Sequence, residues 1–241
     1  MSELRSELLY EGKAKQIYST DNPNEVLIHY KDDATAGNGA KKAQFEDKGV
    51  LNAAISTMIF DYLIENGIKT HLIKQVNDRD VLCEKIDIVL LEVIMRNIAT
   101  GSLTSRLGIK EGTKLNPPIL EFCYKKDEFN DPLINTDHAL ALGLATEKEI
   151  ETISNEARKT NQLLIALFTE IGIELVDFKV EFGRNPEGKI VLADEISPDT
   201  CRLWDVETHS KLDKDRFRQD LGNVIDAYRE IHKRLLARKE K

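Results

Sequence analysis

The sequence predicts an α+β protein in which antiparallel strand pairs pack against a small number of helices. Several short runs rich in Val, Ile, Leu and Phe are separated by turn residues, which is typical of β-hairpins. Three longer stretches place apolar residues at helical spacing. In chain order the pattern is strands, helix, strands, long helix, acidic hairpin and final helix.

The composition describes a soluble, acidic protein with a sizeable core. The 241 residues suffice for one domain or a close pair of lobes, and they are 41% hydrophobic and 32% charged. The net charge of -8 argues against non-specific binding of nucleic acid, which requires a basic face. A local basic pocket for a small anion is compatible with this charge.

The sequence predicts neither a disulfide, nor a zinc site, nor a membrane segment. Its cysteines are odd in number, far apart and without metal-ligand spacing, which fits a reducing cytosol and predicts a cytoplasmic protein. Residues 1–10 lack an apolar signal core. The most apolar run, 86–95, contains Asp87 and Glu92 and is too short to span a bilayer. The cysteines are Cys83, Cys123 and Cys201.

Residues 8–18 predict two strands joined by a tight turn. Gly12 lets the backbone approach a ligand closely, and Lys13 and Lys15, two positions apart, point the same way. The segment suits a flap that covers phosphate groups; an ordinary charged hairpin fits as well, since the Walker A pattern is absent. Residues 31–42 predict a loop that either binds an anion through backbone N–H groups or is plain surface.

The first helix is predicted from apolar residues at helical spacing between 50 and 63, with Gly67 at its end. Residues 74–84 then predict a hairpin around positions 77–78. A longer strand is predicted at 86–95.

The segment that follows this strand combines three features of a phosphate site. Gly101 and Ser102 predict the start of a short helix that Gly108 ends, and a helix N-terminus with a hydroxyl group favours phosphate. Arg96, just upstream, can donate two parallel hydrogen bonds to the same phosphate. The alternative is that Ser102 is a simple N-cap worth ~1 kcal/mol. The accompanying arginine and glycine favour the phosphate interpretation.

The second half of the chain predicts a strand at 119–124 and two long helices. Thr146 and Glu149 form a capping-box pattern, which begins a helix that Gly172 ends. Residues 214–238 predict one continuous amphipathic helix. Loops are predicted at 127–135 and around His138 and His209.

Residues 175–196 predict a β-hairpin with an unusual acidic face. Because side chains alternate along a strand, Asp177, Lys179 and Glu181 share one face, and the opposite face is apolar. This is either the solvated face of an antiparallel sheet or a metal and phosphate site. In the second case Glu181 and Asp194 would hold one Mg²⁺, and Lys179 would neutralise phosphate charge beside it.

Three features that favour phosphate therefore recur in the chain: the turn at 12–15, the helix start after Arg96, and the acidic hairpin, which Arg202 follows closely. The sequence lacks Ser-His-Asp and Cys-His patterns and a dinucleotide glycine fingerprint. It predicts Mg²⁺-dependent phosphoryl transfer from a nucleotide to a second phosphorylated or acidic substrate, in which positioning and charge neutralisation supply most of the catalysis.

Taken in order, these segments resemble the phosphoribosylaminoimidazole-succinocarboxamide synthase (SAICAR synthetase) family of purine biosynthesis. The ordered set spans nearly the whole chain and is far more specific than any single segment. The length fits a single-function bacterial or archaeal form without a fused carboxylase domain. The matching segments are 10–15, 36–39, 96–102, 176–183, 194–199, 202–205 and 213–217.

The resemblance implies a SAICAR synthase-like fold, two-lobed and α+β, similar to kinase and ATP-grasp architecture. The lobe 1–84 would carry the nucleotide flap, and the lobe 85–241 the substrates and metal. The implied reaction joins carboxyaminoimidazole ribonucleotide (CAIR) to L-aspartate while ATP becomes ADP and phosphate, through an acyl phosphate on the CAIR carboxylate. ATP and Mg²⁺ are the implied cofactors, and a homodimer the implied assembly.

The resemblance also implies roles for individual residues. Those implied for ATP are Gly12, Lys13, Ala14 and Lys15 in the flap, with Lys85 and Ile88 at a hinge that meets adenine. Those implied for CAIR are Arg96, Ser102 and Arg202, which clamp its phosphate, with Asp177 and Lys179 at the CAIR end of the site. Glu181 and Asp194 are implied as Mg²⁺ ligands, and Lys15, Asp177 and Lys179 as catalytic residues. Asn38 stands where many relatives carry Asp, so its neutral amide is expected to make only a polar substrate contact.

Two other functions fit the same residues. A small-molecule kinase would release a stable phosphorylated product, and a nucleotide-sensing module would bind without turnover. The L-aspartate pocket stays open among three candidates, which are Asp131, residues 32–38 and Asp199.

Overall fold

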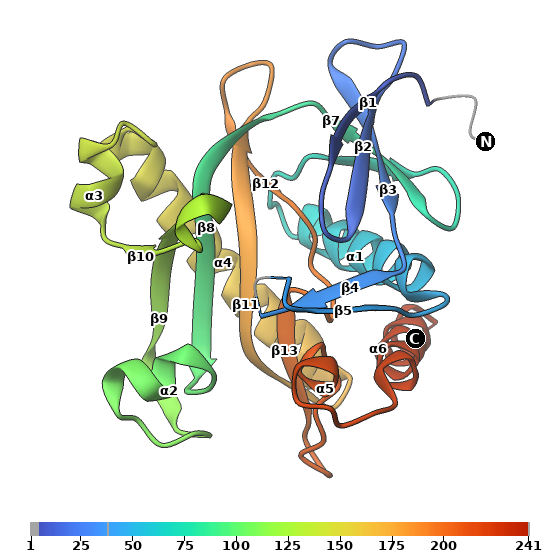
Figure 1. Cartoon of the computed structure of the whole chain (residues 1–241), viewed down its shortest axis with the longest axis vertical. Helices are drawn as coiled ribbons and strands as arrows, with labels where there is room; N and C mark the ends of the chain where they lie inside the picture. The colour runs from blue at the N-terminus through green and yellow to red at the C-terminus, as the bar shows by residue number, and fades with distance from the viewer. Residues whose placement is uncertain (1–4, 38, 241) are drawn as a thin grey trace.

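The computed structural model describes residues 5–37 and 39–240. Within them, the N-terminal part forms a five-stranded antiparallel sheet in the order β1-β2-β3-β7-β6 (Figure 1). A separate two-stranded hairpin, β4-β5, follows β3 in the chain. The strands are β1 (Leu8–Glu11), β2 (Lys15–Ser19), β3 (Glu25–Tyr30), β4 (Asp33–Ala36), β5 (Lys41–Gln44), β6 (Leu72–Gln75) and β7 (Asp80–Glu84).

The second sheet has six strands and is also antiparallel throughout. Its order is β10-β9-β8-β11-β12, and β13 pairs with the first half of β11 on the side where β12 pairs with the second half. The long strand β11 is therefore central. The strands are β8 (Asp87–Ile98), β9 (Lys114–Tyr124), β10 (Leu133–Ile134), β11 (Ile173–Arg184), β12 (Ile190–Ala193) and β13 (Cys201–Asp205).

Helices cover these sheets and close the core. In Figure 1, α4 lies behind β8 and β11, and α1 lies below the first sheet with α6 beside it. One large apolar cluster joins α1, α4 and α6 to the second sheet, and a smaller one lies under the first sheet. The helices are α1 (Lys48–Glu65), α2 (Ser102–Leu107), α3 (Thr136–Ala141), α4 (Glu147–Glu170), α5 (Asp215–Arg218) and α6 (Val224–Lys239), with a 3₁₀ turn at Asp127–Phe129.

The predicted α+β class with antiparallel sheets is confirmed. The chain passes from the first sheet to the second between Glu84 and Asp87. The two halves are nevertheless joined, because α1 contributes Ile55 to the large cluster and Ala53 to the small one. Thr70 also forms a parallel bridge to Leu192 of β12. No helix in the described part of the chain is long and apolar enough to cross a membrane.

The prediction of one helix over 214–238 is wrong. The apolar spacing continues through this stretch, but Gly222 and Asn223 adopt φ values of 71° and 50°, which separate α5 from α6. Leu221, whose apolar side chain continues the helical spacing, is 47% exposed. A left-handed backbone at two consecutive residues cannot continue a right-handed helix.

Two predicted loops contain regular structure. Residues 31–42 include most of the hairpin β4-β5, and 127–135 include the 3₁₀ turn and β10. His138 lies in the first turn of α3, where its ring accepts a hydrogen bond from the N–H of Asn135. His209 lies in a loop, as predicted. These elements are too short for periodicity to reveal them.

The capping box at the start of α4 is confirmed and supplies a stability test. The Thr146 hydroxyl accepts from the N–H of Glu149, whose carboxylate accepts from the N–H of Thr146. We expect Thr146→Ala to cost about 1 kcal/mol of unfolding free energy, or roughly 2–4 °C in Tm for a chain of this size. Urea and thermal denaturation measure this.

The matched control is Thr152→Ala, farther along the same helix. Its hydroxyl donates to the carbonyl of Lys148, four residues earlier, and caps nothing. Equal losses in the two variants would contradict a capping role for Thr146.

Candidate active site

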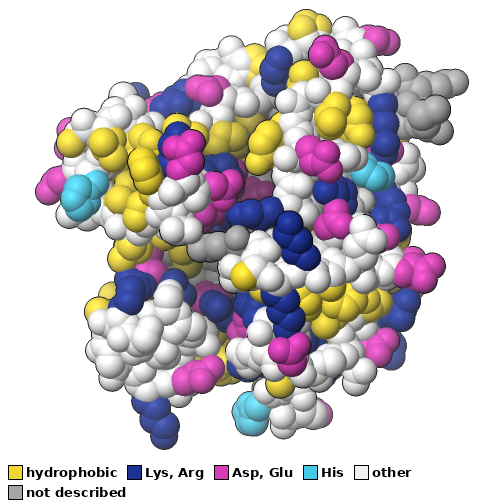
Figure 2. All heavy atoms as spheres, in the orientation of Figure 1, with side chains coloured by type: hydrophobic (Ala, Val, Ile, Leu, Met, Phe, Trp, Pro, Cys, Tyr) yellow, Lys and Arg dark blue, Asp and Glu magenta, His cyan; other side chains and the backbone are white. Residues whose placement is uncertain are grey.

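The central strand β11 presents an apolar face to the core and a charged face to the other side. Val176, Phe178, Val180 and Phe182 are all buried. The register with β8 sets Asp177 opposite Arg96 and Glu181 opposite Glu92. In Figure 2, acidic and basic side chains gather in a hollow near the centre of the visible face.

One end of this charged face is a cluster of lysines and carboxylates. Lys179 Nζ lies 2.5 Å from Glu92 Oε1 and 4.0 Å from Glu181 Oε1. Lys125 Nζ, just beyond β9, lies 2.7 Å from the same Glu181 oxygen. Lys15 Nζ reaches from β2 of the first sheet to Asp194 Oδ1. This lysine–carboxylate cluster therefore draws its members from both sheets.

Asp194 reaches the cluster by leaving the strand. The register sets Ala193, not Asp194, opposite Glu181, so strict alternation would aim Asp194 toward the core side. β12 ends at Ala193, however, and Asp194 has a φ of 68°. Its carboxylate acts electrostatically on that of Glu181, so the predicted metal pair lies in a single charged cluster.

The pKa values in the cluster reflect burial opposed by neighbouring charges. Burial raises the pKa of Asp194, but the Lys15 and Lys179 ammonium groups outweigh it and lower the value to about 2. Burial, and then the charge of Asp194, raise the pKa of Glu181 above its usual range despite Lys125. Burial likewise raises the pKa of Glu195, which Lys15 opposes from 3.9 Å.

These carboxylates suit a magnesium ion that arrives with phosphate. Among the described residues, Glu195 Oε2 is buried without a hydrogen-bond partner, and no group of three or more His, Cys, Asp or Glu side chains forms a metal cage. Mg²⁺ takes one or two carboxylates and completes its shell with water and phosphate oxygens. Glu181 and Asp194 offer that donor set.

The other end of the charged face holds two arginines, Arg96 and Arg202, which we call the arginine pair. Asp177 Oδ2 accepts from both, at 3.1 Å from Arg96 and 2.8 Å from Arg202. Arg96 also donates to Glu121 at 2.6 Å, and Arg202 to Asp215 at 2.9 Å. Each guanidinium is thus fixed by two carboxylates on different elements.

The start of α2 lies against Arg202 of this pair. Gly101 has a φ of 57°, a conformation that favours glycine, and a Cβ there would stand 2.9 Å from an Arg202 nitrogen. Gly101 is the N-cap and Ser102 the first helical residue, so the interpretation of Ser102 as the N-cap is wrong. Gly108 ends the helix with a φ of 65°, as predicted.

The other predicted ATP residues lie around the first sheet and the strand connection. Gly12 N–H donates to the Lys15 carbonyl at 2.8 Å, which closes the predicted tight turn. Lys13 is exposed and pairs with Asp127 at 2.9 Å. The remaining positions are Ala14 in the turn, exposed Lys85 between β7 and β8, and half-buried Ile88 in β8. Asn38 lies outside the described residues.

Sequence reasoning missed Glu92, Lys125, Glu121 and Asp215. Glu92 alone carried a signal, because it stands four residues before Arg96 on one strand face. The others meet the site only through tertiary register. Of the aspartate-pocket candidates, Asp199 is buried with both oxygens bonded, and Asp131 accepts the N–H of Lys126.

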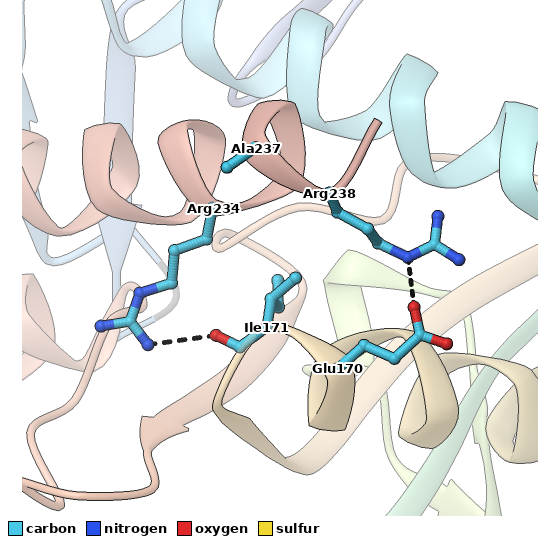
Figure 3. A pocket seen from close by; sticks show the side chains of 5 residues that line it. All are labelled: Glu170, Ile171, Arg234, Ala237 and Arg238. Atoms are coloured by element: carbon cyan, nitrogen blue, oxygen red, sulfur yellow. Dashed lines mark hydrogen bonds and ion pairs between the residues drawn. The ribbon is translucent and has the colours of Figure 1, made fainter. Parts of the chain in front are cut away.

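A second hollow lies away from the charged face. It has a volume of about 680 Å³ and opens between the ends of α4 and α6. Its arginines are engaged, Arg234 with the Ile171 carbonyl at 3.3 Å and Arg238 with Glu170 at 2.5 Å (Figure 3). These walls lack the carboxylate cluster that the central hollow has.

The fold and the charged face together define a two-sheet α+β enzyme for phosphate-bearing substrates. The family model for SAICAR synthetase matches residues 8–235. A phosphoribosylaminoimidazole-succinocarboxamide synthase from Fusobacterium nucleatum is 58% identical over 235 residues, covering 98% of this chain and 99% of its own. One from Clostridium botulinum is 60% identical over 229 residues, covering 95% and 97%.

Solved structures agree. The synthase from Ehrlichia chaffeensis superposes with a TM-score of 0.94 at 48% identity, covering 96% of this chain and 99% of its own. A SAICAR synthetase in complex with ADP gives 0.91 at 50% identity, covering 94% and 96%. The chain therefore belongs to the SAICAR synthetase family, the ATP-dependent ligases that join CAIR to L-aspartate in purine biosynthesis. The resemblance seen in the sequence is confirmed.

A buried acid behind the arginine pair makes stability depend on pH. Asp213 accepts the N–H of Leu203 at 2.8 Å and of Asp215 at 2.7 Å. Burial, and then the charge of Asp215, raise the pKa of Asp213 to about 7, against about 3.9 in an unfolded chain. The folded state therefore binds more protons between these values, and stability falls as pH rises through them.

We expect the unfolding free energy of the wild type to fall relative to that of Asp213→Asn between pH 5 and pH 8, because the amide does not titrate. Urea denaturation at several pH values measures both proteins. A difference that stays constant across this range would contradict the raised pKa.

Proposed function

We propose that the reaction of this chain, ATP + CAIR + L-aspartate → ADP + phosphate + SAICAR, passes through an acyl phosphate. A CAIR carboxylate oxygen attacks the γ-phosphorus of ATP, and the bond to ADP breaks. The aspartate amine then attacks the acyl carbon, the bond to phosphate breaks, and the amine loses a proton. One observation carries this proposal: β11 connects the lysine–carboxylate cluster to the arginine pair on one face.

ATP is assigned to the lysine–carboxylate end and to the lobe 1–84. The turn at Gly12, Lys13 and Ala14 covers the phosphates, Lys15 neutralises their charge, and Lys85 and Ile88 meet adenine at the hinge. The ADP complex of a relative with 50% identity supports nucleotide use. Lys15 and Lys179 are proposed as catalytic because transferred phosphoryl groups need charge neutralisation.

Glu181 and Asp194 are the proposed holders of Mg²⁺, with the buried Glu195 beside them. When bound there, the ion would supply neutralisation of phosphate charge and orientation of the nucleotide. The burial of Glu181 and Glu195 supports the assignment, since buried carboxylates need cations near them.

CAIR is assigned to the arginine end and to the lobe 85–241. Arg96, Arg202 and Ser102 clamp its phosphate, because guanidinium groups match phosphate geometry. Asp177 orients both arginines through one oxygen, and Lys179 faces the carboxylate to be activated. Asn38 is proposed as a polar substrate contact only.

Assembly and location are also proposals. A cytoplasmic homodimer is what the family resemblance implies, and the three cysteines, all free in the structure, are compatible with a reducing compartment. Sedimentation at two protein concentrations tests the dimer.

A coupled assay of ADP release tests the reaction, with CAIR, aspartate and Mg²⁺ omitted in turn. We expect steady release only when all are present. Release that continues fully without aspartate would indicate a kinase, and absence of ATP consumption would indicate a binding module.

We expect Glu181→Gln and Asp194→Asn each to lower kcat by about 10²-fold or more, because each removes a charge that the transferred phosphoryl group requires. Circular dichroism should show the fold unchanged. The matched control is Glu170→Gln, an acid paired with Arg238 at the second hollow, which should keep full activity. Full activity of either Glu181→Gln or Asp194→Asn would show that the substituted residue is not a metal ligand.

We expect Arg202→Ala to raise the KM for CAIR by about 10- to 100-fold, the loss of a charged hydrogen bond, while the KM for ATP stays near its original value. Steady-state kinetics with each substrate varied in turn measures both. An unchanged CAIR requirement would refute the phosphate-clamp role.

A further inference from the structure

We propose that a buried polar stripe on α1, formed by Lys48, Asn52 and Ser56, positions the loop that carries Asp194, and so sets the affinity for magnesium nucleotide. We call residues 194–199 the acid loop. The inference rests on the proposed role of Asp194 as a magnesium ligand. It assigns a positioning role to residues of α1, which act through the loop.

The stripe is unusual for its burial. Its members stand at every fourth position, so they share one helix face. Their exposed fractions are 0% for Lys48, 1% for Asn52 and 2% for Ser56. A fully buried lysine is costly unless it is paired, so this face of α1 must meet a polar partner.

That partner is the acid loop. Lys48 Nζ lies 2.5 Å from Asp199 Oδ2, and the Tyr228 hydroxyl of α6 donates to the other oxygen at 2.6 Å. The Ser56 hydroxyl accepts the N–H of Ile196 at 3.2 Å. Thus α1 binds the loop at Asp199 and at Ile196, and Tyr228 of α6 also binds Asp199.

The loop needs such restraint because of the backbone at Asp194. Its φ of 68° is uncommon for a residue with a side chain, and such conformations persist only where the surroundings enforce them. On the preceding side, Leu192 exchanges backbone hydrogen bonds with Lys69 and His71, both at 2.9 Å. After Asp194, the hydrogen bonds of Ile196 and Asp199 connect the loop to α1.

The stripe and the acid loop each include a buried acceptor atom. Among the described residues, Asn52 Oδ1 and Glu195 Oε2 are buried acceptors without a hydrogen-bond partner. Asn52 lies between Lys48 and Ser56 on the helix. The loop partners of these two residues, Asp199 and Ile196, lie within four residues of Glu195. Such oxygen acceptors are of the kind that Mg²⁺ or the water around it binds.

The test measures ADP binding by calorimetry, with Mg²⁺ and with EDTA, in Ser56→Ala, Tyr228→Phe and Asp199→Asn. We expect the Kd for ADP with Mg²⁺ to rise by about tenfold, the effect of removing a residue that orients a metal ligand. The Kd in EDTA should stay unchanged. Tyr228→Phe and Ser56→Ala are mild enough to keep the test valid if Asp199→Asn does not fold.

The control is Arg234→Met, on the same helix as Tyr228. It removes an ion pair of 2.7 Å to the buried Asp205, away from the acid loop, and should lower Tm while keeping the wild-type Kd with Mg²⁺. The inference would be overturned if these three variants lower Tm but keep the wild-type Kd for ADP with Mg²⁺, or if they raise the Kd equally in EDTA. Wild-type Mg²⁺-dependent binding by Asp194→Asn would instead overturn the proposed metal site.

Discussion

The alternation of side chains along β11 is the constraint on which the rest of the site depends. Its apolar face is held in the core by four fully buried residues, from Val176 to Phe182. A slip of one residue would turn the apolar face toward the charged groups and the charges into the apolar core, so the core fixes the register. Asp177, Lys179 and Glu181 point into the site because Phe178 and Val180 point away from it. The hydrophobic core thus determines where the chemistry can occur.

The charged face is stable only as an assembly. A buried carboxylate without a cation is strongly unfavourable, and each acid here finds its cation on another element. Asp194 of the β12 end depends on Lys15 of β2, and Glu181 of β11 depends on Lys125 beyond β9. Neither sheet alone supplies both the carboxylates and all the cations that neutralise them. This requirement explains why the two sheets meet at the lysine–carboxylate cluster.

Local patterns predicted much of the fold, and tertiary contacts account for what they missed. The Thr146 capping box and the acidic hairpin are encoded within a few residues, so sequence alone revealed them. The break before α6 was missed because two left-handed residues override an apolar stripe that otherwise continues. Glu181 and Asp194, predicted as a pair, both belong to the lysine–carboxylate cluster, but alternation does not explain this, since Asp194 lies outside the strand. Lys125 and Lys48 were missed because their partners lie 56 and 151 positions away.

The spacing along β11 also limits how the substrates can lie. Pairing with β8 is regular from Asp177 to Glu181, and irregularities in the pairing of β11 flank this stretch on both sides. Four residues of strand span about 13 Å, so the arginine end and the carboxylate end stand roughly that far apart along the backbone. A sugar phosphate bound at the arginine end, as we propose, would extend its far group past Lys179 toward the carboxylate end. Because bulges re-aim side chains, a regular stretch between two irregular ones keeps this spacing fixed. Transfer between two bound molecules requires such a fixed separation, because misplacement of the reacting atoms by even about 1 Å is costly.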